Sequence, residues 1–265
     1  MLRRAKRLSL LAAAMLLSAP CVLFNLFVPT KDTLVVLMSL VLVRTMRGSG
    51  PGRMALFALV LYAVYAGFIR SYFALVIAVA FGAFLYLNLP RSGRIVVTGA
   101  AALLIFSLPS SVYVALLSPR DAAVDYLVYQ SQHHVRTSFY NPFDPSTFLG
   151  FVADYFYAVG RLNFPLFFSL GVKEFVLQLF AVLAVWPAVG AICKKRPRVA
   201  VPPHAMLACL LIGHVSVSML FEPDLGSYAR HLSSVALFSM VLLIDRANSQ
   251  QPVRARSSEV VAERT

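Results

Sequence analysis

The sequence predicts an all-α protein built as a bundle of transmembrane helices, and three observations lead to this fold class. The chain has 265 residues, 59% of them hydrophobic and 13% charged, whereas soluble domains carry about 25% charged residues. The hydrophobic residues gather in runs close to the length that a helix needs to cross a bilayer. Lysine and arginine concentrate between alternate runs. Together these features exclude an ordinary soluble domain and a disordered chain.

About eight apolar runs are expected to form spans. The first follows a basic N-terminus and continues past Pro20-Cys21, which favours an uncleaved helix over a signal peptide. The run 54–89 is too long for one straight span, and its interruption at Arg70-Ser71 predicts two helices that meet at a membrane surface. The runs are 8–28, 33–43, 54–89 as two helices, 95–117, 174–193, 204–221 and 231–244.

The charges predict the orientation of these helices. With the N-terminus inside, the cytoplasmic segments 1–7, 44–53, 90–94, 194–203 and 245–265 hold 17 of the 24 lysines and arginines and three of the 11 acids. Positive residues are retained on the cytoplasmic side, so both termini are expected on the cytoplasmic side of the membrane. The net charge of +13 then reflects topology, which argues against a nucleic-acid partner. One integral-membrane domain, 1–245, is expected to precede a disordered cytoplasmic tail, 246–265.

One long segment, 118–173, is expected on the outer face, and its length makes it the expected seat of function. Its first part predicts an amphipathic helix on the membrane surface, with Val124 and Leu127 on one face and Asp121 and Asp125 on the other. Prolines in 141–145 are expected to end this helix. The second part, 148–172, predicts a re-entrant or interfacial helix, with a ninth span as the alternative.

Arginines gather in the expected outer segments. Guanidinium groups bind phosphate oxygens in bidentate fashion, so the arginines together suit a diphosphate headgroup at the membrane surface. Each also has a structural interpretation, such as a charge at a helix end or, for Arg161, a contact with Asp154 two turns earlier. The candidate substrate-binding residues are Arg70, Arg120, Arg136, Arg161 and Arg230, with Tyr129 as a stacking surface for a sugar ring or an interface anchor.

His231 is the candidate general base for a sugar hydroxyl, because it follows Arg230 in a short predicted loop that also contains Glu222. Asp154 and Glu222 are the carboxylate alternatives. A histidine satisfied by backbone or water at a helix start is the structural interpretation. His214, in the middle of the run 204–221, is expected to bond to another helix. The three cysteines and the histidines show no metal-ligand spacing, and neither a metal nor another cofactor is predicted.

The segment Phe68-Ile69-Arg70-Ser71-Tyr72-Phe73-Ala74 resembles the Arg-x-x-x-Ala start of a membrane helix in EpsG-like and Wzy-like polysaccharide polymerases. Those proteins also carry a large outer loop with Asp and Tyr at its beginning, to which Asp121 and Tyr129 are similar, and an arginine at the outer start of a late helix, to which Arg230 is similar. The resemblance implies a glycosyltransferase that polymerises undecaprenyl-diphosphate-linked oligosaccharide repeat units for surface polysaccharide or exopolysaccharide. It implies contact with membrane lipids and with other polysaccharide assembly proteins.

Four other functions remain open, one of them a non-catalytic membrane scaffold, which nothing in the sequence excludes. An O-antigen ligase uses a similar loop with arginine and histidine. A GT-C-type lipid-linked glycosyltransferase carries catalytic acids in its first outer loop, which here is only 29–32. A transporter or flippase of lipid-linked sugars is expected to show internal repeats and charges at mid-bilayer, and the two halves of this chain show no repeat.

Overall fold

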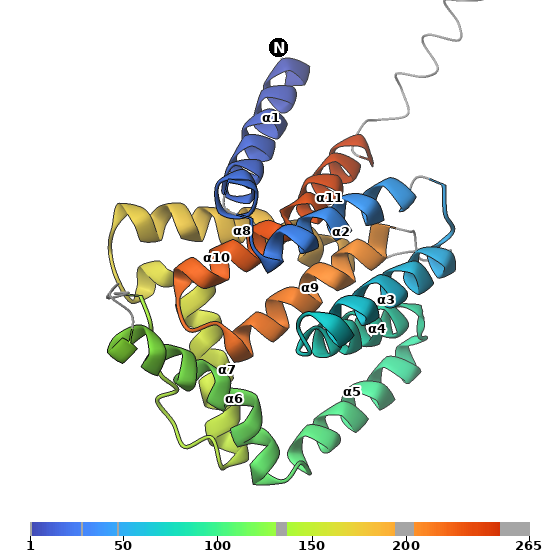
Figure 1. Cartoon of the computed structure of the whole chain (residues 1–265). Coiled ribbons are helices and arrows are strands. Elements are labelled where there is room, and N and C mark those ends of the chain that lie inside the picture. Colours follow the sequence, from blue (N-terminus) through green and yellow to red (C-terminus); the bar gives the residue numbers. More distant parts are fainter. Residues whose placement is uncertain (1, 28, 47, 131–136, 194–203, 250–265) are drawn as a thin grey trace, which may run out of the picture.

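The computed structural model describes residues 2–27, 29–46, 48–130, 137–193 and 204–249, and within these ranges the protein is helical without strands (Figure 1). Helices make up 84% of the structure. The α-helices are α1 (Leu2–Cys21), α2 (Lys31–Met46), α3 (Pro51–Phe68), α4 (Phe73–Asn88), α5 (Arg91–Phe106), α6 (Ser110–Asp125), α7 (Phe148–Asn163), α8 (Val172–Cys193), α9 (His204–Phe221), α10 (Leu225–Ser234) and α11 (Ala236–Ser249). Short π-helices cover Val22–Leu26 and Tyr126–Gln130, and a short 3-10 helix covers Pro165–Phe167.

Several helices are long and apolar enough to cross a membrane. Among the described residues, Leu8–Leu26, α3, α8 and α9 meet this criterion singly. The pairs α5–α6 and α10–α11 meet it only when their two helices are taken together, and these pairs are bent at the break by 86° and 59°. The structure therefore has four to six candidate spans, which makes this a membrane protein by length and composition. The expected spans α2 and α4 have 16 residues each.

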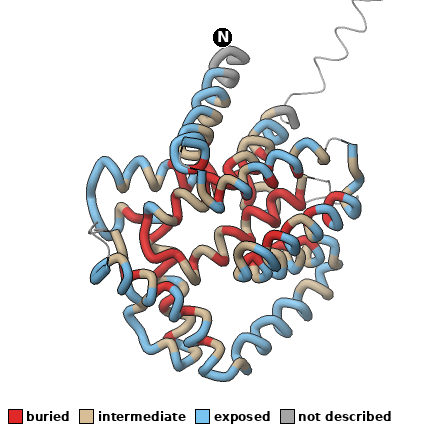
Figure 2. Tube along the Cα trace, viewed as in Figure 1, coloured by how far each residue is buried: buried red, intermediate tan, exposed pale blue. Residues whose placement is uncertain are grey.

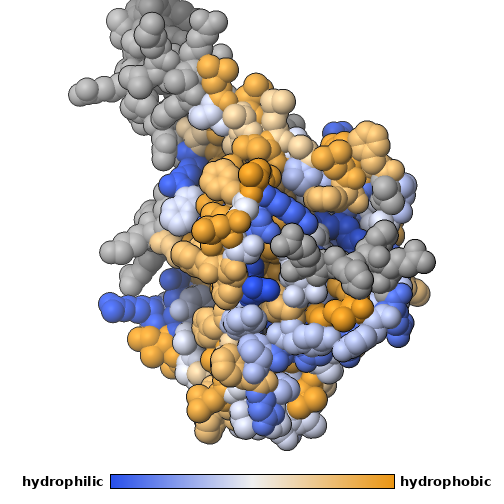
Figure 3. Space-filling view, turned by 90° about the vertical axis from the view of Figure 1, so that its left-hand side faces the viewer, coloured by the Kyte–Doolittle hydropathy of each residue, from blue (hydrophilic) through white to orange (hydrophobic). Residues whose placement is uncertain are grey.

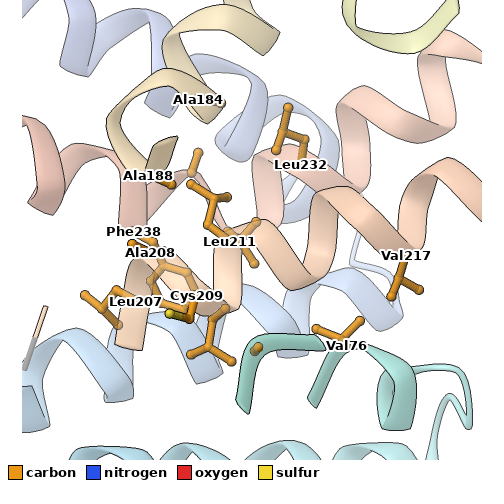
Figure 4. Packing of buried hydrophobic residues seen from close by; sticks show 14 of the residues in the cluster. Val76, Ala184, Ala188, Leu207, Ala208, Cys209, Leu211, Val217, Leu232 and Phe238 are labelled. Atoms are coloured by element: carbon orange, nitrogen blue, oxygen red, sulfur yellow. The ribbon is translucent and has the colours of Figure 1, made fainter. Parts of the chain in front are cut away.

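Helix α9 forms the centre of the bundle. It contacts α3, α4, α6, α7, α8, α10 and α11, and Figure 2 shows it among the most buried elements. The close-up in Figure 4 places Ala184 and Ala188 of α8, Leu232 of α10 and Phe238 of α11 around its side chains. Small residues in such positions let helix backbones approach closely. Packing against α9 therefore fixes the positions of the surrounding helices relative to one another.

The closest approach in this core lies between α9 and α4. A Cβ added to Gly213 would lie 2.7 Å from the carbonyl oxygen of Val76 and 3.3 Å from the Cβ of Ala80. Glycine is therefore required at this position by space. The contact matters for the site described below, because α4 starts three residues after Arg70 and α9 ends directly before Glu222.

Two of the expected spans are wrong as single helices. The run 95–117 breaks at Ser107–Pro109, where α5 ends and α6 begins. Proline disfavours helical geometry in the residue before it, and the chain turns by 86° here. The run 231–244 instead belongs to α10 and α11, which bend apart at Val235. The predicted break of 54–89 is confirmed, because α3 ends at Phe68 and α4 begins at Phe73.

The segment 118–173 is also organised differently from the prediction. No separate amphipathic helix begins at 118, because α6 continues through Pro119 to Asp125. The break over 141–145 is confirmed. Helix α7 covers the start of 148–172 and is not among the candidate spans, so its interfacial or re-entrant placement stays a prediction. Helix α11 extends to Ser249, and the predicted tail beyond it lies outside the described residues.

Candidate functional site

Charged side chains from distant parts of the chain meet at one end of the bundle. We call this group, Asp32, Arg70, Glu222, Arg230 and His231, the Asp32 cluster. Asp32 lies in the first turn of α2, Arg70 in the link between α3 and α4, Glu222 directly after α9, and the other two in α10. Of the catalytic and binding residues that the sequence predicts, the structure brings together Arg70, Glu222, Arg230 and His231.

Local structure explains how Asp32 and Arg70 come together. A carboxylate is favoured in the first turn of a helix, where the backbone N–H groups are unpaired. The end of α3 is fixed to the start of α2, because the Tyr65 hydroxyl donates to the carbonyl of Lys31 at 3.0 Å. Arg70 follows α3 by two residues and reaches back to Asp32 across this junction.

The Asp32 carboxylate is buried at the middle of the cluster. Its Oδ1 accepts from Nη1 of Arg70 at 2.8 Å and lies 3.3 Å from Nε2 of His231, and its Oδ2 lies 3.2 Å from Nε of Arg230. Burial alone would raise the pKa of Asp32. The hydrogen bond with His231 and the charges of His231, Arg70 and Arg230 outweigh burial and hold this pKa below its usual value.

His231 lies between two carboxylates. Its Nδ1 bonds to Oε1 of Glu222, which is buried, and its Nε2 lies 2.8 Å from Nη1 of Arg70. The contact with Glu222 fixes the orientation of the imidazole ring. A histidine held by a carboxylate at one nitrogen can exchange a proton at the other, and here that other nitrogen, Nε2, faces Arg70 and Asp32. His231 lies in the last turn of α10, not in a loop as the sequence predicts.

Aromatic and polar residues support the cluster from the bundle interior. Arg70 also donates to the hydroxyl of Tyr72 at 2.9 Å. A narrow cavity beneath is lined in part by Asp32, Tyr72, His214 and His231. The expectation for His214 is confirmed, because its Nε2 lies 2.9 Å from the hydroxyl of Tyr62 on α3.

Arg120 and Asp154 lie in a different environment. Arg120 is fully buried in α6, donates to Oδ1 of Asn141 at 2.7 Å and to the carbonyl of Met219 on α9, and its guanidinium lies 5.0 Å from the ring of Phe139. Asp154 is buried in α7 and accepts from the backbone N–H of Phe143 at 3.0 Å. Arg120 thus joins segment 118–173 to α9, whereas Asp154 fixes the break over 141–145 to α7 within that segment, which gives each a structural task in this arrangement.

The remaining candidates lie apart from the Asp32 cluster or outside the described residues. Arg161 is not paired with Asp154 but lies among aromatic rings and lines its own pocket. Tyr129 is 78% exposed. Arg136 falls in 131–136, outside the part of the chain that the structure describes.

Sequence reasoning missed Asp32, the residue at the middle of the cluster. The available signal was an acid at the boundary of an apolar run, in the short predicted outer segment 29–32. An ionised residue at the edge of the hydrocarbon requires a partner, and Arg70 is that partner. Comparisons of the chain with models of protein families, with curated proteins and with solved structures find no match.

Proposed function

We propose that the protein is a glycosyltransferase that polymerises undecaprenyl-diphosphate-linked glycan repeat units at the outer face of a bacterial inner membrane. In this proposal the chain has eight crossings with both termini in the cytoplasm. The Asp32 cluster carries the proposal. It joins residues from three predicted outer segments, 29–32, 70–71 and 222–230, at one end of the bundle. This supports their common placement at the outer surface.

The two arginines of the cluster suit a diphosphate. The side chains of Arg70 and Arg230 are 19% and 40% exposed, whereas the Asp32 side chain is only 2% exposed. A lipid diphosphate can therefore approach the arginines from solvent. Guanidinium groups form paired hydrogen bonds with phosphate oxygens. The bound diphosphate therefore replaces the Asp32 carboxylate as the partner of Arg70 and Arg230. Asp32 keeps the arginines in place while the site is empty.

His231 suits the proton transfer. A diphosphate that draws Arg70 away leaves Nε2 of His231 to the acceptor hydroxyl. The neutral form of the ring then accepts the hydroxyl proton at Nε2, and Glu222 at Nδ1 stabilises the imidazolium that forms. The hydroxyl oxygen forms a bond to C1 of the donor sugar, and the bond from C1 to the diphosphate oxygen breaks. The undecaprenyl diphosphate leaves with that electron pair, and the arginines stabilise its charge. No nucleotide takes part, because the lipid diphosphate is itself the leaving group.

A second transferase function has a specific observation in its favour. A GT-C-type enzyme uses an acid of the first outer loop, and Asp32 from segment 29–32 lies buried at the middle of the cluster. In that reaction Asp32 is the base and a single lipid-linked sugar is the donor. The two proposals predict different effects of Asp32→Asn on activity. In the GT-C-type reaction this variant lacks the catalytic base, whereas in the polymerase reaction it loses only the charge that holds Arg70 and Arg230 in the empty site.

The first test is the length profile of surface polysaccharide on a gel from a strain that lacks the gene. Polymerase function predicts collapse of the ladder to single repeats. Long lipid-linked chains without attachment would show a ligase instead, and an unchanged profile would overturn both. Complementation by Arg70→Gln or His231→Gln is expected to leave the ladder collapsed. The control, Arg53→Gln, alters an exposed arginine of α3 and is expected to restore it, with membrane expression of every variant verified by immunoblot.

A further inference from the structure

A second site lies between the end of α7 and the start of α8. It is a pocket of about 460 Å³, a size within the usual range for small-ligand sites. We call it the Arg161 pocket, after the residue that distinguishes it. Its polar lining includes Thr137, Arg161, Ser169 and Lys173, and its apolar lining includes Pro165, Phe168, Leu170 and Leu225.

Arg161 is held by aromatic rings alone. Its guanidinium lies 5.0 Å from the ring centre of Phe168, 5.4 Å from that of Phe139 and 5.9 Å from that of Tyr157. Within the described residues it forms neither an ion pair nor a hydrogen bond. Rings fix the plane of a guanidinium without using its N–H groups. These donors are therefore available to an anion in the pocket.

The charge of the lining is positive. Arg161 and Lys173 face one acid, Glu174, whose Oε2 lies over Gly171, since a Cβ added there would meet it at 2.2 Å. Glu174 belongs to the first turn of α8, where a carboxylate is stabilised by the helix dipole. Its charge is thus partly offset at the helix start. On the face shown in Figure 3, hydrophilic side chains lie among hydrophobic ones.

We propose that the Arg161 pocket binds a sugar residue that carries a carboxylate or phosphate group. The guanidinium of Arg161 accepts the anion in bidentate fashion. The exposed ring of Phe168 packs against the apolar face of the sugar, and the hydroxyls of Thr137 and Ser169 bond to its hydroxyl groups. The ligand is thus an acidic unit of a glycan, and this identification rests on the proposed function.

Helix α10 joins the pocket to the Asp32 cluster. Leu225 at its start lines the pocket, and His231 near its end belongs to the cluster. The Tyr228 hydroxyl donates to Oδ1 of Asn163 at 2.8 Å, which holds α10 against the end of α7. A glycan seated in the pocket is therefore positioned by the helix that carries the reactive histidine.

The experiment measures binding of glucuronate, glucose 6-phosphate, glucose and inorganic phosphate to the purified full chain in detergent, by saturation-transfer NMR titration. The two acidic sugars are expected to bind at least tenfold more tightly than glucose, and more tightly than phosphate. Arg161→Gln is expected to weaken their binding tenfold or more, and Lys173→Gln severalfold. Arg53→Gln, at an exposed arginine of α3, is the matched control. Since Lys173 is exposed, its variant keeps the test valid if Arg161→Gln does not fold.

Equal binding of glucuronate and glucose would overturn the inference, as would unchanged binding by both variants or phosphate binding as tight as that of glucose 6-phosphate. Loss of acidic-sugar binding when the protein is moved into nanodiscs containing phosphatidylglycerol would assign the pocket to a lipid headgroup and likewise overturn it. Binding requires no catalysis. An unchanged polysaccharide ladder with intact glucuronate binding would therefore remove only the proposed reaction, and the reverse result would remove only the pocket.

Discussion

Gly213→Ala tests whether close packing of α4 on α9 holds the structure together. The added Cβ would lie 2.7 Å from the carbonyl oxygen of Val76, about 0.7 Å closer than the 3.4 Å at which ordinary contacts begin. The nearest atom is backbone, so no side-chain rotation relieves the contact and the two helices must separate. Overpacking of this kind costs about 1–3 kcal/mol. The ends of both helices lead into the Asp32 cluster, so activity is expected to fall as well.

Thermal unfolding in detergent, followed by far-UV circular dichroism, measures the effect. Gly82→Ala is the matched control, because Gly82 is exposed on α4 and a Cβ there would meet no atom within 4 Å. Alanine stabilises a helix interior by about 0.5–1 kcal/mol relative to glycine, so this variant is expected to unfold at a slightly higher temperature than the parent. A Gly213→Ala variant as stable as Gly82→Ala would refute the argument that α4 and α9 are in backbone contact.

Two further predictions concern the site. Because the pKa of Asp32 lies below its usual value in the folded protein, the ionised carboxylate contributes stability that is present at neutral pH and is lost as the pH falls below about 4. Melting temperature is thus expected to drop more steeply between about pH 5 and pH 3 in the parent than in Asp32→Asn, and parallel slopes would contradict this. Asp224 caps the N-terminus of α10, because its Oδ1 accepts from the backbone N–H groups of Gly226 and Ser227. Asp224→Ala removes this cap and is expected to lower the free energy of unfolding by about 0.5–2 kcal/mol. Asp224→Ser, which can still cap, is expected to stay close to the parent in the same unfolding assay, and equal losses in both variants would show that the cap is not the cause.

Local signals in the sequence predicted much of the helical layout. The apolar run 204–221 matches α9 at both ends. The interruption at Arg70-Ser71 falls between α3 and α4. Such features depend on a short stretch of chain, because length and hydropathy decide whether a segment forms an apolar helix. The hydrogen bond of His214 to another helix was also predictable from its local sequence, because a polar residue inside an apolar helix requires a partner.

Bends within apolar runs were not predictable in the same way. Pro109 gave a local signal, but prolines are tolerated within membrane helices when neighbouring groups satisfy the freed backbone. The choice between a kinked span and a sharp turn of 86° therefore depends on what the two halves pack against. The bend at Val235 lacks even a proline, and it places His231 at the end of α10 rather than at the start of a span.

The sequence by itself determined an apolar helical chain with cationic and acidic residues at the ends of its helices. Tertiary structure decided which of these residues meet. It placed Asp32 between Arg70 and Arg230, enclosed Arg120 within the bundle, and separated Arg161 into a pocket of its own. The physical reason is that these contacts join segments up to about 200 residues apart. Their formation depends on how helices pack around α9, through close contacts such as that of Gly213 with Val76, and not on the residues next to them in the chain.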